Sequence, residues 1–190
     1  MKRSFDFCWA LVCLILFSPL FLVCYIAIRL EDGGPAFFRQ ERIGKGGKSF
    51  DILKFRSMTV DGNRDEYALF KHEKNENLTR IGRFLRDHHL DELPQLWNVV
   101  KGDMSFVGPR PERKYYIDLI MEKDPRYERL YQLRPGVTSY ATLHNGYTDT
   151  MEKMLTRLEM DLYYLEHQSL MLDAKILAQT FLYIVFGKKF

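Results

Sequence analysis

Cysteine is scarce in this sequence and confined to one end. Cys8, Cys13 and Cys24 lie within an apolar N-terminal stretch, and no cysteine follows them. Because a disulfide framework needs cysteines spread through the chain, this distribution excludes one and agrees with a polar domain kept in reducing cytosol. Recognition-helix patterns, zinc spacings and aromatic RNA-binding signatures are lacking as well, so nucleic acid is not an expected partner.

The chain also has little net charge, formally +3 over 190 residues. Its basic side chains are nevertheless concentrated between Arg39 and Arg56, where six Lys or Arg residues fall within 56 − 39 + 1 = 18 positions. A local basic region of this kind suits phosphate groups or anionic lipid headgroups. The length allows one domain with a real core but is short for two, so we expect one domain plus an anchor.

Formal charge is absent from Phe7 to Ile28, a stretch of 28 − 7 + 1 = 22 residues. A helix of that length would extend about 33 Å, enough to span a bilayer. Ser18-Pro19 interrupts the stretch near its middle, and Pro19 has no N–H to give to the carbonyl of Ile15. We therefore expect a bend or break at this point, with the Ser18 hydroxyl bound to a freed carbonyl.

Both flanks of this stretch are basic, with Lys2 and Arg3 before it and Arg29 after it. A spanning helix normally has asymmetric flanks, so these favour a re-entrant helix whose two ends lie at the cytoplasmic surface, with a single span as the alternative. A cleaved signal peptide does not fit, because the apolar region is too long and no small-x-small cleavage site follows it. We assign residues 1–31 to a membrane anchor and residues 32–190 to a compact cytosolic domain.

The remainder of the chain predicts an α+β fold that is mostly helical, with a small β-hairpin and interfacial amphipathic helices. Two strands, Ala36–Gln40 and Ser49–Phe55, flank a glycine-rich basic turn and account for the hairpin. Apolar residues at helical spacing predict helices at 81–85, 125–133, 154–165 and 170–186. The charged segment 61–77 predicts a solvated helix or loop. The apolar and aromatic end, 181–190, either rests in the headgroup layer or packs on the core.

The densest set of reactive side chains runs from His88 to Asn98 and contains the adjacent carboxylates Asp91 and Glu92. Since Pro94 suits a first helical turn, we expect a helix to begin between Asp91 and Pro94. Such a terminus stabilises an ionised carboxylate and attracts phosphate, and a carboxylate held there can attack phosphorus. Acidic residues are also common in first turns for purely structural reasons, and that interpretation stays open.

A basic residue on a stiff loop follows. Arg110 lies between Pro109 and Pro111, and the two prolines restrict the backbone on both sides of it. A guanidinium held in this way suits bidentate contact with a phosphate, with a salt bridge to an acidic neighbour as the alternative.

Metal binding by this region is restricted to one kind of ion. His88 and His89 are next to the carboxylates, but adjacent histidines point in different directions on a helix, and no second ligand group has zinc spacing. A dedicated transition-metal site is therefore not expected. Magnesium needs only one or two carboxylates together with substrate phosphates, so Asp91 and Glu92 are candidate Mg²⁺ ligands.

Several ordered motifs resemble those of the bacterial sugar transferase family, the monotopic phosphoglycosyl transferases that begin lipid-linked glycan assembly. The resemblance is to the small members and covers nearly the whole chain. The motifs that carry it are Phe37–Gly44, Lys54–Met58, Leu90–Leu96, Gly102–Pro111 and Arg134–Thr138. The Ser18-Pro19 break also resembles the re-entrant anchor of this family.

The resemblance implies a two-step reaction on the cytoplasmic face of the bacterial inner membrane. Asp91 would attack the β-phosphorus of a UDP-sugar and release UMP, and a polyprenyl phosphate would then take the phosphosugar from Asp91. Mg²⁺ is the implied cofactor, and Glu92 would bind it or orient the acceptor. The residues implied as phosphate contacts are Lys54, Arg56, Arg86 and Arg110. Contact with membrane lipids is implied too, and a homo-oligomer is left open.

The chain departs from the family pattern in two places. His89 stands where the family usually has Ser or Thr, so capping of the helix there is left open. Segment 139–146 lacks the glycine and glutamine of many members, so neither the sugar nor its recognition residues can be inferred. Asp161 and Asp173 fall on late acidic positions of the family, but surface or capping positions in a helix explain them equally well.

Two other functions fit the same residues. A membrane-bound glycosyltransferase would move the sugar without phosphate and release UDP rather than UMP. A non-catalytic, membrane-anchored scaffold would bind lipid headgroups or partner proteins through its basic face, and Asp91 would then be dispensable.

Overall fold

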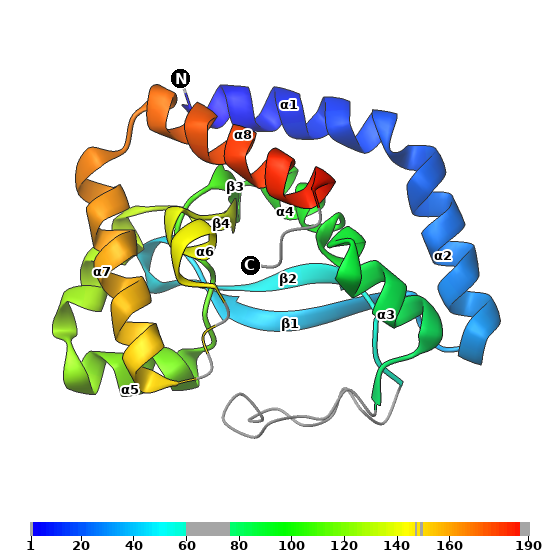
Figure 1. The fold of residues 1–190 in the computed structure, drawn as a ribbon, viewed down its shortest axis with the longest axis horizontal. Coiled ribbons are helices and arrows are strands. Elements are labelled where there is room, and N and C mark those ends of the chain that lie inside the picture. The colour runs from blue at the N-terminus through cyan, green and yellow to red at the C-terminus, as the bar shows by residue number, and fades with distance from the viewer. Residues whose placement is uncertain (1, 60–76, 147, 149, 187–190) are drawn as a thin grey trace.

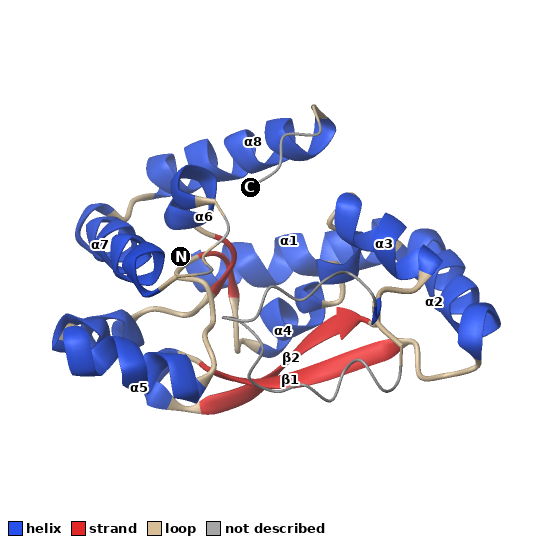
Figure 2. Cartoon of the chain, turned by 60° about the horizontal axis from the view of Figure 1, so that its bottom comes forward, coloured by secondary structure: helices blue, strands red, loops and turns tan. Residues whose placement is uncertain are grey.

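A two-stranded β-hairpin lies along one side of this protein, with helices above it and at both of its ends (Figures 1 and 2). The computed structural model describes residues 2–59, 77–146, 148 and 150–186. Its α-helices are α1 (Lys2–Leu16), α2 (Ser18–Asp32), α3 (Arg80–Asp87), α4 (Gln95–Lys101), α5 (Lys114–Lys123), α6 (Tyr140–Asn145), α7 (Met151–His167) and α8 (Leu170–Val185). The remaining elements are the 3₁₀ helices η1 (Lys45–Gly47), η5 (Leu90–Glu92) and η6 (Pro125–Gln132) and the strands β1 (Phe37–Ile43), β2 (Ser49–Phe55), β3 (Ser105–Val107) and β4 (Gly136–Thr138).

The apolar N-terminal segment is broken at Phe17, where α1 and α2 meet at an angle of 61° (Figure 1). The Ser18 hydroxyl donates a hydrogen bond of 2.7 Å to the carbonyl of Ile15, the group that Pro19 cannot satisfy. The predicted break and its hydrogen bond are therefore both confirmed. No single helix in the described ranges is long and apolar enough to cross a membrane, and α1 and α2 meet that requirement only as a bent pair.

Polar side chains at the start of α1 attach it to the rest of the molecule. Lys2 forms an ion pair with Asp173 in the first turn of α8, and Asp173 also accepts a hydrogen bond of 2.6 Å from the Tyr164 hydroxyl. Arg3 donates to two carbonyl oxygens in the last turn of α4, where helix carbonyls otherwise lack partners. The two basic residues that form the N-terminal flank in sequence are thus bound to the protein itself.

The other end of the bent pair is attached as well. Gly33 ends α2 with a left-handed backbone, φ 71°. The carboxylate of Glu31 accepts hydrogen bonds from the first backbone N–H groups of α3, at 2.7 Å from Arg80. Asp32 forms an ion pair with Arg56, which follows β2. Both ends of the α1–α2 pair are therefore bound to the same body of helices and strands.

The hairpin is longer than predicted. β1 and β2 pair antiparallel without interruption, and the first strand continues to Ile43 rather than ending at Gln40. Paired residues share a face and successive residues alternate, so one face carries the pairs Phe38 with Lys54, Gln40 with Ile52 and Arg42 with Phe50. Asn98 of α4 holds this hairpin, because its amide accepts from one backbone N–H of β2 at 3.0 Å and donates to a backbone carbonyl of β2 at 2.7 Å.

The helices predicted after the hairpin are mostly present. α7 buries Met154, Leu158 and Leu162 against α5 and η6, as their spacing predicted, and α8 is confirmed almost to its predicted end. The predicted helix at 125–133 is a 3₁₀ helix. Neither α5 nor the short parallel pair β3–β4 was predicted. In α3, Phe84 points outward and is 54% exposed instead of packing with its apolar neighbours.

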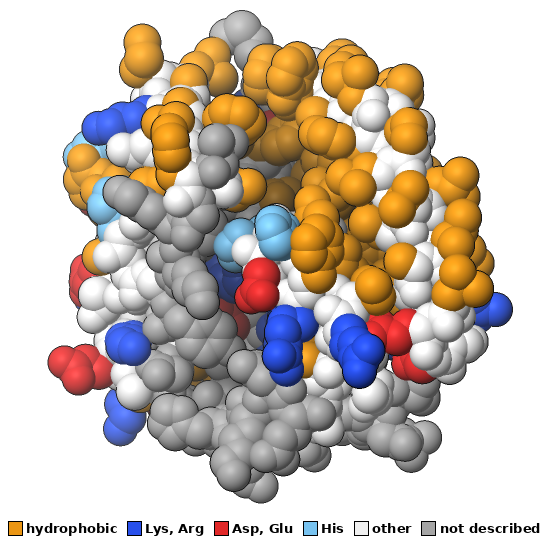
Figure 3. Space-filling view, turned by 45° about the vertical axis from the view of Figure 1, so that its right-hand side comes forward, with side chains coloured by type: hydrophobic (Ala, Val, Ile, Leu, Met, Phe, Trp, Pro, Cys, Tyr) orange, Lys and Arg blue, Asp and Glu red, His pale blue; other side chains and the backbone are white. Residues whose placement is uncertain are grey.

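Parts of two predictions lie outside the described residues. They are the charged segment 61–77, except for Asn77, and the last four positions, 187–190. Large apolar side chains stay exposed along three helices in the described ranges. They include Phe5, Trp9, Ile15 and Leu16 on α1, Leu22, Val23 and Leu30 on α2, and Leu170, Met171, Phe181 and Leu182 on α8. Figure 3 shows hydrophobic side chains covering the face over α2 and the top of the molecule, with charged and histidine side chains below them.

Ser105→Ala tests the polar attachment of α1. Asp6 of α1 is 4% exposed and accepts a hydrogen bond of 2.8 Å from the Ser105 hydroxyl. Removing that donor from a buried carboxylate should lower the free energy of unfolding by about 1–3 kcal/mol, measured by denaturant unfolding in detergent. Thr156→Ala, which removes an exposed hydroxyl bound within α7, is the control and should change little. Equal effects of the two substitutions would contradict the account.

Candidate active site

The two candidate carboxylates lie in η5, a tight turn between α3 and α4. Asp91 and Glu92 precede α4, which begins at Gln95 with Pro94 as its cap. The predicted helix start between Asp91 and Pro94 is therefore wrong: the carboxylates belong to a separate 3₁₀ turn. The turn is closed by backbone hydrogen bonds of 3.4 Å and 3.2 Å.

His89 explains why α3 and α4 do not run together. Its φ of 54° is in the left-handed region, which no other non-glycine residue of the described chain adopts. This conformation is unfavourable for a residue with a Cβ. It ends α3 and turns the chain into η5, and the imidazole makes no capping hydrogen bond to that turn. Strained backbone of this kind is often found at functional sites.

Glu92 is held by two basic side chains. Its Oε1 lies 2.6 Å from Lys54 Nζ and 3.5 Å from Arg110 Nη2. Burial raises the pKa of Glu92, but Lys54 and Arg110 outweigh this effect and lower the pKa to about 2. Glu92 is therefore ionised at any physiological pH and is already paired.

Asp91, in contrast, is buried and is not paired with any described residue. It is 8% exposed, and no residue of the described ranges makes a hydrogen bond or ion pair with its carboxylate. Burial raises the pKa of Asp91, Lys54 and Arg86 lower it, Glu92 raises it, and the net shift is upward. Two adjacent carboxyl groups thus have different environments, and only one of them has its charge already neutralised by a partner.

The structure brings together some of the predicted phosphate-binding residues. Lys54 from β2 and Arg110 from the loop after β3 both reach Glu92. Arg86 of α3 contributes to the electrostatics of Asp91, and its Nε donates to the Ser57 hydroxyl at 3.0 Å.

Arg56 lies elsewhere. It is 3% exposed, is ion-paired with Asp32, and packs against Gly34 so closely that a Cβ there would lie 2.1 Å from its Nη1. These contacts tie the end of β2 to the end of α2. Nε and Nη1 of Arg56 are buried and have no hydrogen-bond partner among the described residues, and the role of Arg56 in binding phosphate stays a prediction.

The carboxylates also suit one class of metal ion. No group of three or more His, Cys, Asp or Glu side chains that might hold a metal occurs among the described residues. Asp91 and Glu92 supply two carboxylates, and the oxygens of Asp91 have no partner within the described part of the chain. This donor set fits Mg²⁺, which takes its remaining ligands from water and substrate phosphates.

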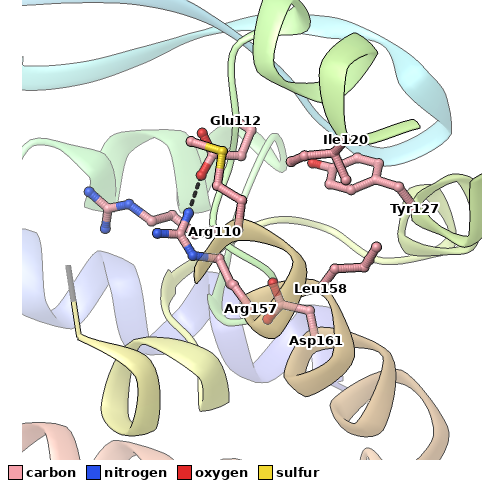
Figure 4. A pocket seen from close by; sticks show the side chains of 8 residues that line it. Arg110, Glu112, Ile120, Tyr127, Arg157, Leu158 and Asp161 are labelled. Carbon is pink, nitrogen blue, oxygen red and sulfur yellow. Dashed lines mark hydrogen bonds and ion pairs between the residues drawn. The ribbon is translucent and has the colours of Figure 1, made fainter. Parts of the chain in front are cut away.

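A small cavity lies behind Arg110, between its loop and α7 (Figure 4). In it Arg157 of α7 forms an ion pair with Glu112, and both side chains are nearly buried. Asp161 lines the same cavity and is 3% exposed, and its Oδ1 has no hydrogen-bond partner in the described ranges. Burial raises its pKa to about 7, although Arg157 lowers it.

The surface interpretation of Asp161 is therefore wrong. The residue lies seven positions after Met154 and three after Leu158, so it falls on the buried stripe of α7, a signal present in the sequence. Asp173 is bound to Lys2 and Tyr164. The pairing of Glu112 with Arg157, 45 residues apart, had no local signal and was missed.

Comparison with known proteins places the chain in a family. It matches the model of the bacterial sugar transferase family over residues 1–187. A UDP-N-acetylgalactosamine-undecaprenyl-phosphate N-acetylgalactosaminephosphotransferase from Aeromonas hydrophila is 38% identical over 98% of this chain and 44% of its own length. A UDP-glucose:undecaprenyl-phosphate glucose-1-phosphate transferase from Caulobacter vibrioides is 42% identical, over 94% of this chain and 67% of its own length. The chain belongs to the bacterial sugar transferase family.

The match also differs in extent from relative to relative. The chain spans less than half the length of the Aeromonas protein. An uncharacterized sugar transferase, EpsL of Bacillus subtilis, is 39% identical over 95% of this chain and 85% of its own length. These relatives therefore match nearly the whole of this chain.

Asp161→Asn tests the buried carboxyl group. In the folded protein the pKa of Asp161 is about 7, above the ordinary value of 3.8. The contribution of this carboxyl group to the stability of the fold is therefore complete below about pH 3.8 and is lost as the pH rises through about 7. Asparagine cannot ionise, so the change in melting temperature relative to wild type should be more favourable at pH 8 than at pH 5, by about 2–4 °C or more. Glu122→Gln on the exposed face of α5 is the control. An equal change at both pH values would contradict the buried titration.

Proposed function

We propose that this chain transfers a phosphosugar from a UDP-sugar to a polyprenyl phosphate and releases UMP. The relatives from Aeromonas and Caulobacter are both named as transferases of this kind acting on undecaprenyl phosphate, one with a UDP-N-acetylgalactosamine donor and the other with UDP-glucose. Because these names differ in the sugar, the sugar stays open. The observation that carries the proposal is the buried carboxylate of Asp91, unpaired beside the paired Glu92.

Asp91 is the proposed nucleophile. Its carboxylate oxygen attacks the β-phosphorus of the donor, the bond from that phosphorus to the bridging oxygen breaks, and UMP leaves with the bonding electrons. A phosphate oxygen of the acceptor then attacks the same phosphorus. The bond to Asp91 breaks, and the carboxylate is regenerated. Because no described residue makes a hydrogen bond to the Asp91 carboxylate, no such bond has to break before the first attack.

Glu92 and its partners provide charge at the same place. Lys54 and Arg110 meet at one oxygen of Glu92, so their positive charges are positioned where the diphosphate of the donor comes close to Asp91. Reactions of this class depend mainly on positioning and on charge neutralisation. Mg²⁺ held by Asp91 and Glu92 would supply further neutralisation of phosphate charge.

We also propose that the α1–α2 pair enters one leaflet of the bacterial inner membrane from the cytoplasmic side and returns. Its exposed apolar residues and its 61° bend support this. So do the attachments at its two ends, Lys2 to Asp173 and Asp32 to Arg56. A single span would place those ends on opposite sides of the bilayer, whereas both are bound to the same body. The exposed apolar residues of α8 suit the same interface.

Release of UMP from a panel of UDP-sugars tests the activity. Asp91→Asn should lower the rate at least about a thousandfold, because amides do not replace carboxylates as nucleophiles. Glu122→Gln should leave it unchanged. Release of UDP in place of UMP would support a glycosyltransferase without phosphate transfer, and normal turnover by Asp91→Asn would remove Asp91 from the reaction.

Lys54→Met tests the electrostatic coupling through the pH profile of kcat. A carboxylate nucleophile acts when ionised, so the rate falls as the pH falls through its pKa. Lys54 lowers the pKa of both Asp91 and Glu92, so its loss should move this acidic limb to higher pH. Lys48→Met, in the exposed hairpin turn, should leave the limb in place. If the acidic limb of the kcat profile stayed at the same pH in Lys54→Met, Asp91 would not titrate in the rate-limiting step.

A further inference from the structure

Four arginines gather around Glu112 beyond the catalytic carboxylates. This arginine cluster consists of Arg42 of β1, Arg110, Arg113 at the cap of α5, and Arg157 of α7. Arg157 is ion-paired with Glu112. Burial lowers the pKa of Arg42 to about 10, Glu112 raises it, and the like charges of Arg113 and Arg110 lower it further.

The cluster carries an excess of positive charge. Among the described residues, three carboxyl groups face the four guanidinium groups. They are Glu112, Glu92, which is 3.5 Å from Arg110 and is shared with Lys54, and Asp161, whose pKa is raised to about 7. Like-charged groups are brought this close together at a cost unless an anion joins them.

The cluster also has unused hydrogen-bond donors. Nε of Arg42 and both Nε and Nη1 of Arg113 are buried and have no hydrogen-bond partner among the residues that the structure describes. A buried N–H group without a partner is costly, and a group of them calls for a bound acceptor. Guanidinium groups match the paired oxygens of a phosphate. Charge and hydrogen bonding therefore indicate the same missing partner, a phosphate group.

The hairpin connects the arginine cluster to the carboxylates. In the register, Lys54 pairs with Phe38 and Arg42 pairs with Phe50. Because Phe38 and Arg42 are an even number of residues apart on β1, Arg42 lies on the same face of the hairpin as Lys54. The distance from Phe38 to Arg42 is four residues, about 13 Å along a strand. Lys54 binds Glu92 at one end of this face, and Arg42 marks the other end.

Arg110 lies between these two ends. It contacts Glu92 at 3.5 Å, and it also contributes to the electrostatics of Arg42 and Arg157. Its loop is fixed on both sides, since the backbone N–H of Ile43 donates to Glu112 at 3.0 Å and that of Gly136 donates to Pro109 at 2.9 Å. A continuous line of positive charge thus leads from the carboxylates to the cluster.

The anchor lies at the opposite end of the hairpin. Phe37 and Phe55 form the first pair of the register, and their rings pack against Tyr25 and Phe21 of α2 at 6.1 Å and 5.4 Å between centroids. A lipid phosphate that arrives along the anchor reaches the carboxylates from this end. The arginine cluster, at the far end, is left for the water-soluble substrate.

We propose that the arginine cluster binds the nucleoside monophosphate half of the donor, with its α-phosphate at Arg42 and Arg113. The inference rests on the proposed function, and it assigns a binding site to UMP, the leaving group of that reaction. Arg42 and Arg113 are the substrate contacts. Arg157 is a positioning residue that acts through Glu112 on the loop of Arg110.

Binding of UMP to the full chain in detergent micelles tests the assignment, by calorimetry with Mg²⁺ present and uridine as the ligand that lacks phosphate. Arg42→Gln and Arg113→Gln should each weaken UMP binding by about tenfold or more, because each loses a charged hydrogen bond to phosphate. The affinity for uridine and the KM for a short polyprenyl phosphate should stay within about twofold. Arg129→Gln, which removes an exposed arginine paired with Glu166, is the matched control and should bind UMP like wild type.

The outcomes separate the two proposals. UMP binding by wild type that is equally strong in both variants would overturn the cluster assignment and leave the proposed function intact. Equal weakening for UMP and for the lipid phosphate would overturn it as well, because the cluster would then serve the acceptor. If wild type releases UMP in turnover but substitutions in the cluster do not change the UMP affinity, only this inference fails. If wild type neither binds nor releases UMP, the proposed function fails first.

A conservative variant guards against misfolding. Arg42→Lys keeps the charge but loses the planar fork, so its UMP affinity should fall between those of wild type and Arg42→Gln. A melting temperature equal to that of Arg129→Gln shows that the variant is folded. The assignment would be contradicted if folded Arg42→Lys, Arg113→Lys and Arg113→Gln all bound UMP with the affinity of wild type.

Discussion

The contact of Lys54 and Arg110 with Glu92 decides what the neighbouring Asp91 can do. Two adjacent carboxylates in one turn repel each other, and both would gain from the same cations. Because Glu92 takes them, it is ionised and fixed, with a pKa near 2, while Asp91 is left buried and unpaired. Which of the two carboxylates is paired therefore follows from which one the hairpin lysine reaches.

The hairpin gives this division a direction. One end of it packs against α2 through Phe37 and Phe55. Lys54 and the carboxylates come next, and Arg42 lies farther along the same face. Under the proposed function, a lipid acceptor and a soluble donor would approach Asp91 from opposite ends of this hairpin. The attachment of both ends of the α1–α2 pair to the surrounding helices keeps this arrangement fixed with respect to the apolar surface.

Features that depend on neighbours in sequence were predictable. The break at Ser18-Pro19, the hairpin and the buried stripe of α7 each follow from covalent geometry or from periodicity over a few turns. The candidate carboxylates were found by their clustering with Arg110 in one region of the chain. The 3₁₀ turn was not foreseen, because it depends on the left-handed backbone of His89, which nothing in the residue type requires.

Features that depend on distant partners were not predictable. Arg56 matched a motif but is bound to Asp32, 24 residues earlier, and Lys2 reaches Asp173, 171 residues later. No pattern in a single sequence joins such pairs. Asp161 was predictable only in part. Its place on the stripe of α7 follows from the sequence, but carboxylates are rarely buried, so the burial of Asp161 becomes evident only from the cavity around it. The substrate classes rest on family resemblance rather than on the residues alone.

The central claim is that an oxygen of Asp91 bonds to phosphorus. The direct measurement is peptide mass spectrometry of the protein quenched after incubation with an accepted UDP-sugar and no acceptor. The account predicts a phosphosugar mass on the peptide that contains Asp91, lost on addition of polyprenyl phosphate and absent from Asp91→Asn. Rapid release of UMP on acceptor addition without any adduct, or an adduct on a different residue, would contradict it.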